Sequence, residues 1–269
     1  MKTKSVLQHY LFSEKIDDNF LHNWISNVVD GGNTSFQDGI LGVGWLLGYL
    51  IEHNYIEADA DEILGDIDDA IYKLCIREIV ASQIDVNELL CFVGYYQQRI
   101  SYNSDEHIYR RFIHMECMKL LLEKLNQYLR KSVKMQKKNL VLSTNILMKY
   151  SRLVRSSCVS EGLVEEPFYN TIENLIKFYE QEKDKKVYST SIAKLYFSVK
   201  QYHHPHWEIR LFHILEELRI NQLPLETIQW LYLAEAVSLE CKEDINNYEK
   251  PLRTPENFSV YFEYITNTV

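Results

Sequence analysis

The side chains best suited to hold a metal ion lie together in the stretch QYHHPHWE. The candidates are His203, His204 and His206, with His213 further along the chain. Neutral imidazoles are common zinc ligands, and three of them with one open position can form a catalytic zinc site. Pro205 favours the first turn of a helix, which would place the cation of Arg210 between His206 and His213. We therefore expect a polar helix start rather than a metal site.

Other catalytic patterns are weaker still. His114 and Cys117 are spaced i,i+3 and could supply two metal ligands, but we expect this pair to pack on the outer face of a helix. The sequence contains neither an HExxH zinc motif nor a GxSxG nucleophile elbow. We therefore expect no cofactor, zinc included, and the catalytic residues, if there are any, stay unassigned.

A basic run, LRKSVKMQKK, could bind an acidic peptide through Arg130, Lys131 and Lys134. The same run falls at the expected end of a helix, where cations interact favourably with the helix dipole. A solvated helix end is therefore the alternative to a peptide-binding site.

Four glycines lie among large apolar side chains in DGILGVGWLLGYL. They form a motif of Gly39, Gly42, Gly44, Trp45 and Gly48. A dinucleotide-binding loop requires GxGxxG after a strand, and a membrane helix requires about 20 apolar residues; this stretch has neither. It predicts a helix surrounded by protein, capped by Asp38, in which the glycines allow other backbones to approach closely.

The next segment, residues 59–80, has one apolar stripe, which is typical of an outer helix. Asp59 and Glu62 match a capping box. The carboxylates of Asp61, Asp66, Asp68 and Asp69 do not form the DDxxD pattern of a diphosphate-binding metal site. We expect these four carboxylates on a solvated face.

Apolar segments recur at nearly constant spacing. Gly44, Gly94, Asn145 and Leu195 mark equivalent positions in residues 40–50, 88–100, 141–154 and 188–202. Amphipathic segments lie between them, and the repeat length of about 50 residues suits a helix pair. We predict an all-α fold, a single domain over residues 1–269, in which inner and outer helix hairpins form a curved or ring-like array.

Composition excludes several classes of protein. The chain of 269 residues carries a net charge of −9, which argues against nucleic-acid binding because phosphates require a basic surface. The five cysteines include no CxxC pair, and residues 1–15 lack the apolar core of a signal peptide. We therefore expect a cytoplasmic protein that does not bind membranes, and the oligomeric state stays open.

The stretch GILGVGWLLGYLIEHNYIEADADEILGDIDDAIY resembles the signature region of lanthionine synthetase C-like (LanC-like) proteins, in particular a divergent bacterial branch found in Bacteroidetes. The resemblance covers about residues 35 to 100. It implies an α/α toroid, here an incomplete or shortened ring. Family cyclases hold zinc with two cysteines and a histidine, and one ligand pair is Cys-His followed by glycine. No cysteine of this chain is followed by histidine, so no zinc ligand is transferred from the family.

The resemblance without the zinc ligands implies a non-catalytic helical scaffold, a pseudoenzyme that binds a peptide or an enzyme partner in a ribosomal-peptide modification system. Two alternatives stay open. One is an active peptide cyclase with a rebuilt site, and the other is a repeat-type protein-interaction module without a peptide substrate.

Overall fold

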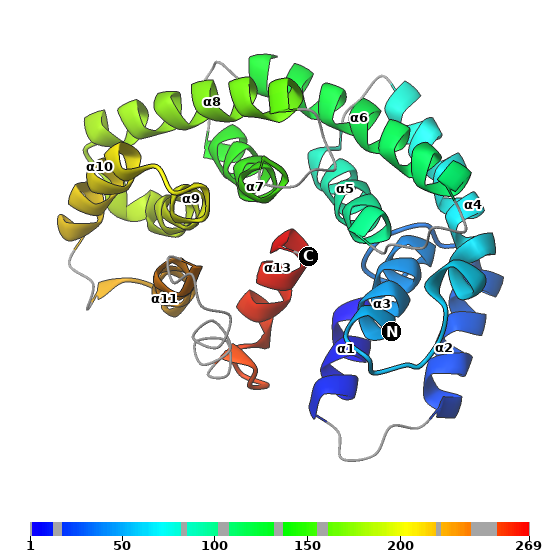
Figure 1. The fold of residues 1–269 in the computed structure, drawn as a ribbon. Helices are drawn as coiled ribbons and strands as arrows, with labels where there is room; N and C mark the ends of the chain where they lie inside the picture. Colours follow the sequence, from blue (N-terminus) through cyan, green and yellow to red (C-terminus); the bar gives the residue numbers. More distant parts are fainter. Residues whose placement is uncertain are drawn as a thin grey trace. The chain divides into compact units, whose positions relative to one another are not determined.

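A computed structural model describes residues 2–12, 18–81, 85–101, 108–131, 137–154, 161–218, 222–237 and 252–268. Within these ranges the protein has 12 α-helices and no strand, which confirms the all-α prediction (Figure 1). The first six helices are α1 (Thr3–Phe12), α2 (Asp18–Gly31), α3 (Ile40–Glu52), α4 (Ala60–Val80), α5 (Val86–Ser101) and α6 (Ile108–Lys131). The others are α7 (Lys137–Leu153), α8 (Glu161–Gln181), α9 (Ser189–Tyr202), α10 (Pro205–Glu216), α11 (Leu225–Val237) and α13 (Phe258–Thr268), with a 3-10 turn η2 (Lys185–Tyr188) before α9.

The chain divides into two compact units, Met1–Leu125 and Asn126–Thr268. In the first unit α3 is the central helix, and it contacts α1, α2, α4 and α5. From Leu41 to Ile51 every residue of α3 is buried, as expected for a helix that is apolar on all sides. The glycine-rich segment is therefore an internal helix.

The two predicted caps have different outcomes. Asp59 caps α4, because its carboxylate accepts hydrogen bonds from the backbone N–H groups of Asp61 (2.7 Å) and Glu62 (3.1 Å). Asp38 does not cap α3: the N-cap residue is Gly39, and no side chain caps it. The carboxylate of Asp38 instead accepts hydrogen bonds from side chains of the preceding loop.

In the second unit α9 is the central helix and contacts α7, α10 and α11, while α13 contacts α7 and α11. Phe197 of α9 meets Trp230 of α11 edge to face, at 5.3 Å between ring centroids, a favourable aromatic geometry. Lys194 of α9 is bonded to Glu263 of α13 and lies over the Trp230 ring. These contacts fix α11 and α13 against α9.

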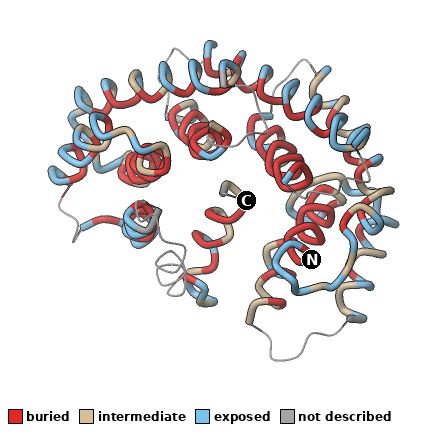
Figure 2. The backbone as a smooth tube through the Cα atoms, in the orientation of Figure 1, coloured by how far each residue is buried: buried red, intermediate tan, exposed pale blue. Residues whose placement is uncertain are grey.

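Burial alternates along the chain as the repeat predicts (Figure 2). Helices α3, α5 and α9 are buried almost throughout, whereas α4, α6, α8 and α10 each expose one side. The equivalent positions of the repeat fall in α3, α5, α7 and α9. Successive helices thus differ in burial, while the inner and outer hairpin array, the single domain and the ring stay predictions. No helix in the described ranges is both long and apolar enough to cross a membrane.

Candidate functional site

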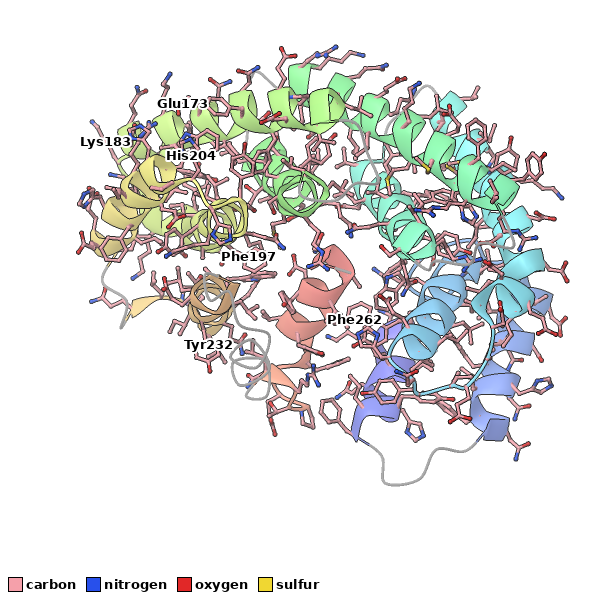
Figure 3. All side chains as sticks on the ribbon, viewed as in Figure 1. Glu173, Lys183, Phe197, His204, Tyr232 and Phe262 are labelled. Atoms are coloured by element: carbon pink, nitrogen blue, oxygen red, sulfur yellow. The ribbon has the colours of Figure 1, made fainter. Side chains whose placement is uncertain are left out.

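Of the four histidines considered as metal ligands, His203 and His204 form the α9–α10 connection, where Figure 3 labels His204. His203 ends α9 in the left-handed conformation, with φ of 59°. His204 caps α10, where its Nδ1 accepts a weak hydrogen bond from the backbone N–H of Trp207 (3.4 Å) and its ring stacks on the indole. His206 is exposed, and His213 lies 3.2 Å from Glu216. Pro205 begins α10 as predicted.

Arg210 pairs with acidic residues of α8 rather than separating two metal ligands. Its guanidinium bonds both carboxylate oxygens of Glu173 at 2.9 Å, and Glu180 at 2.7 and 2.8 Å. The indole Nε1 of Trp207 also donates to Glu173 (2.9 Å). Within the described ranges no group of three or more His, Cys, Asp or Glu side chains is arranged to hold a metal ion. This region therefore fastens α10 to α8.

The basic run is only partly described. Arg130 and Lys131 are exposed in the last turn of α6, where their charges complement the helix dipole. Lys134 lies outside the described residues. Its role in peptide binding stays a prediction.

The glycine motif has a packing role that differs in one respect from the prediction. A Cβ at Gly39 or Gly42 would collide with loop backbone, at Asn33 and Ser35 or at Phe36 respectively. At Gly44 and Gly48 the close neighbours are side chains instead, from Ile67, Ile71 and Tyr95, and from Gln98. The expectation of close backbone approach is therefore wrong for these two glycines. Trp45 is fully buried beside them.

A buried charge cluster joins α4, α5 and α6. Asp68 accepts hydrogen bonds from the hydroxyl of Tyr95 (2.5 Å) and from Nε and Nη2 of Arg99 (3.1 and 2.9 Å). Arg99 Nη2 also reaches Asp61 (2.5 Å), and Arg110 lies 3.3 Å from Asp68. The expected solvated face is thus wrong for Asp68, which is 3% exposed, and for the partly buried Asp61; Asp66 and Asp69 are exposed as predicted.

His114 and Cys117 face inward to this region and not outward. His114 Nε2 lies 3.5 Å from Asp68, yet burial lowers the pKa of His114 to about 4, so its ring is neutral at pH 7. Burial and a hydrogen bond with Cys117 raise the pKa of Cys75. Since Asp68 and Arg99 neutralise each other and both are buried, the cluster serves to join three helices.

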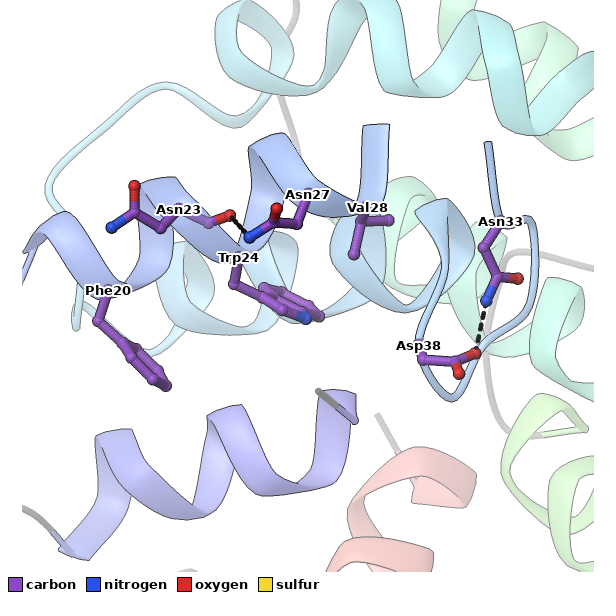
Figure 4. A pocket seen from close by; sticks show the side chains of 7 residues that line it. All are labelled: Phe20, Asn23, Trp24, Asn27, Val28, Asn33 and Asp38. Carbon is purple, nitrogen blue, oxygen red and sulfur yellow. Dashed lines mark hydrogen bonds between the residues drawn. The ribbon is translucent and has the colours of Figure 1, made fainter. Parts of the chain in front are cut away.

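An open pocket of about 510 Å³ lies beside α2 (Figure 4). Seven residues line it: Phe20, Asn23, Trp24, Asn27, Val28, Asn33 and Asp38. Its volume falls in the range of about 300–1,000 Å³ that is usual for ligand sites. The lining combines two aromatic rings with three primary amides and a single carboxylate. This pocket is therefore a candidate ligand site within the described part of the chain.

The local sequence explains the wall that α2 contributes. Trp24 and Val28, spaced i,i+4, are buried, and Phe20 contacts the ring of His9 on α1 at 4.6 Å. Asn23 and Asn27 are exposed, one turn apart on the same helix. The amide Nδ2 of Asn27 donates to the carbonyl oxygen of Asn23 (2.7 Å). Among the described residues, none bonds the carbonyl oxygen or the second N–H of the Asn27 amide, which a ligand can therefore bond.

The loop that follows α2 supplies the rest of the lining. Gly32, with φ of 61°, ends the helix in a conformation that favours glycine. Asn33 then accepts a bond from the Ser35 backbone N–H (3.1 Å) through its side chain, and its own carbonyl oxygen accepts from Ile40 N–H (2.9 Å). These bonds fix the loop against the start of α3.

Asp38 is held at the end of this loop. Its Oδ1 accepts hydrogen bonds from the hydroxyl of Ser35 (2.6 Å) and the amide of Asn33 (2.9 Å). Both bonds lower the pKa of Asp38 below its ordinary value, so the carboxylate is ionised at neutral pH. The pocket therefore contains one fixed negative charge.

Of these pocket residues, only Asp38 is singled out by sequence reasoning, and then for capping. The i,i+4 spacing of Phe20, Trp24 and Val28 is a signal that could have located α2. How close α2 lies to the loop depends on tertiary packing, and the spacing of apolar residues along α2 gives no information about that distance. Compared with known proteins, the chain matches no family model, no curated protein and no solved structure.

Proposed function

We propose that this protein is a helical peptide-binding scaffold, and that the α2 pocket holds an extended segment of its peptide or protein partner. The observation that carries the proposal is the pair of exposed amides at Asn23 and Asn27, next to the buried ring of Trp24. A primary amide has a donor and an acceptor side by side, as does the edge of a peptide bond.

The spacing of the two amides suits an extended peptide. Residues four apart on a helix are separated by about 6 Å along the axis. Alternate residues of an extended chain point the same way and recur about every 6.6 Å. Asn23 and Asn27 can therefore each bond one of two alternate peptide groups, while the peptide side chain between them meets the apolar lining.

Two further features fit the proposal at larger scale. The succession of internal and one-sided helices supports a LanC-like α/α toroid, and the resemblance over residues 35 to 100 supports a scaffold role in a ribosomal-peptide modification system. The peptide of such a system is the partner that we propose.

Panning phage-displayed random dodecapeptides on the protein tests this function. An enriched peptide, synthesised with a fluorescent label, is titrated against the wild type and the Asn23→Ala/Asn27→Ala variant. Loss of two hydrogen bonds of about 0.5–1.5 kcal/mol each should weaken binding about five- to 150-fold. The matched control is His22→Ala/Asp30→Ala, which changes two exposed residues of α2 outside the pocket lining. Failure to enrich any peptide, or equal weakening in the control, contradicts the proposal.

A further inference from the structure

The charge of the pocket indicates what kind of peptide it takes. Six of its seven lining residues are neutral, and Asp38 alone carries a formal charge. Asn33 and Ser35 occupy Oδ1 of Asp38. Among the described residues no donor is bonded to Oδ2, and no cation forms an ion pair with this carboxylate. The N-terminal amino group and, less strongly, Lys2 act on it through their longer-range charge.

The carboxylate is also fixed in position, since the bonds to Oδ1 restrict its rotation. A ligand that covers a fixed charge without pairing with it removes water from that charge at a cost in free energy. An acidic ligand is repelled, whereas a cation regains the lost hydration as an ion pair. Figure 4 shows Asp38 and Asn33 on the loop and the asparagine pair along α2.

We propose that the pocket selects peptides with a lysine or arginine, whose cation pairs with Oδ2 of Asp38 while the backbone bonds Asn23 and Asn27. This inference rests on the proposed function, since it names the class of peptide that the same site takes. The basic residue lies beyond the stretch that bonds the asparagines, at the loop end of the pocket.

Three sets of labelled octapeptides test the inference. All have acetylated and amidated ends and random neutral flanks, and they differ in one central residue: lysine, glutamine or glutamate. The lysine set should bind about three- to fivefold more tightly than the glutamine set, the upper range for an exposed ion pair, and the glutamate set most weakly. Raising the salt concentration should reduce the difference.

The decisive variant is Asp38→Asn, which removes the charge and keeps an oxygen that can accept from Ser35 and Asn33. It should abolish the preference for lysine, while the control Asp30→Asn, on α2 outside the lining, keeps it. A preference that persists in Asp38→Asn, or equal binding of the lysine and glutamine sets, overturns the inference. If the glutamine set still depends on Asn23 and Asn27, the proposed function survives that result. If no set binds, the proposed function fails, and the inference with it.

Discussion

At Asp68 one carboxylate meets donors from two other helices. Tyr95 and Arg99 reach it from α5, and Arg110 reaches it from α6. Removing such a carboxylate from water costs free energy. Here Arg99 offsets that cost, because it is positively charged and donates hydrogen bonds to both carboxylate oxygens. Burial opposes the charge of Arg99, but its hydrogen bonds with Asp68 prevail and raise its pKa. Arg99 therefore stays charged over the pH range in which proteins fold.

His114, beside this pair, should make stability depend on pH. Its pKa is about 4 in the folded protein, because burial opposes the charged ring and Arg99 and Arg110 repel it, although Asp68 and Asp61 favour it. The ordinary value is 6.5, so between pH 6.5 and 4 the unfolded chain takes up a proton that the folded chain refuses. As the pH is lowered from 6.5 to 4, the free energy of unfolding should therefore decrease by up to about 1.4 kcal/mol per pH unit.

Urea unfolding measured at several pH values checks this slope. His114→Gln removes the titrating group and should flatten the dependence between pH 6.5 and 4. His213→Gln changes an exposed histidine and should leave it as in the wild type. If His114→Gln retains the wild-type slope, another group is responsible.

At the scale of elements, the close fit of α3 to its neighbours can be tested at Gly44. A Cβ there would lie 2.8 Å from Tyr95 Cε2 and 2.9 Å from Ile67 Cγ2 and Ile71 Cδ1. Gly44→Leu should therefore destabilise the protein by about 1–3 kcal/mol or more through overpacking. This outweighs the roughly 0.8 kcal/mol of helix propensity that the substitution gains.

Gly162→Leu is the matched control, because Gly162 is also helical and no atom lies within 4 Å of its would-be Cβ. It should gain the helix propensity without a clash and be neutral or slightly stabilising. Thermal melts of both variants give the comparison. Equal effects of the two substitutions would refute the tight packing of α3.

The helices were predictable because the residues that become buried are apolar, and apolar residues recur along the sequence with the period of a helix. The apolar segments around Gly94 and Leu195 became α5 and α9 for this reason. The burial of Asp68 was not predictable. A carboxylate is buried only where partners compensate its charge, and Arg99, its partner, lies 31 residues away in the sequence. Asp38 failed as a cap for a similar reason: Ser35 and Asn33 compete for its carboxylate, and Gly39 takes the N-cap position.

At the scale of the whole molecule, the pocket depends on the meeting of two segments. Asn23 and Trp24 come from α2, and Asn33 and Asp38 come from a loop whose course is set by Gly32 and by bonds to α3. Each segment is ordinary in sequence, and neither has a recognisable binding motif. A site of this kind arises from tertiary packing, so composition and periodicity could predict the fold class but not the pocket.

The toroid proposal and the prediction of one domain have a common consequence for size. If Met1–Leu125 and Asn126–Thr268 pack together as one compact domain, small-angle X-ray scattering should give a radius of gyration of about 18 Å, the value expected for a compact chain of 269 residues. Two units of about 14 Å each, joined in sequence but not packed together, would give a clearly larger radius and a second maximum in the distance distribution. That result would contradict the single domain while leaving the α2 pocket intact, because every residue of the pocket belongs to the first unit. Since size and peptide binding are measured independently, each proposal can fail without the other.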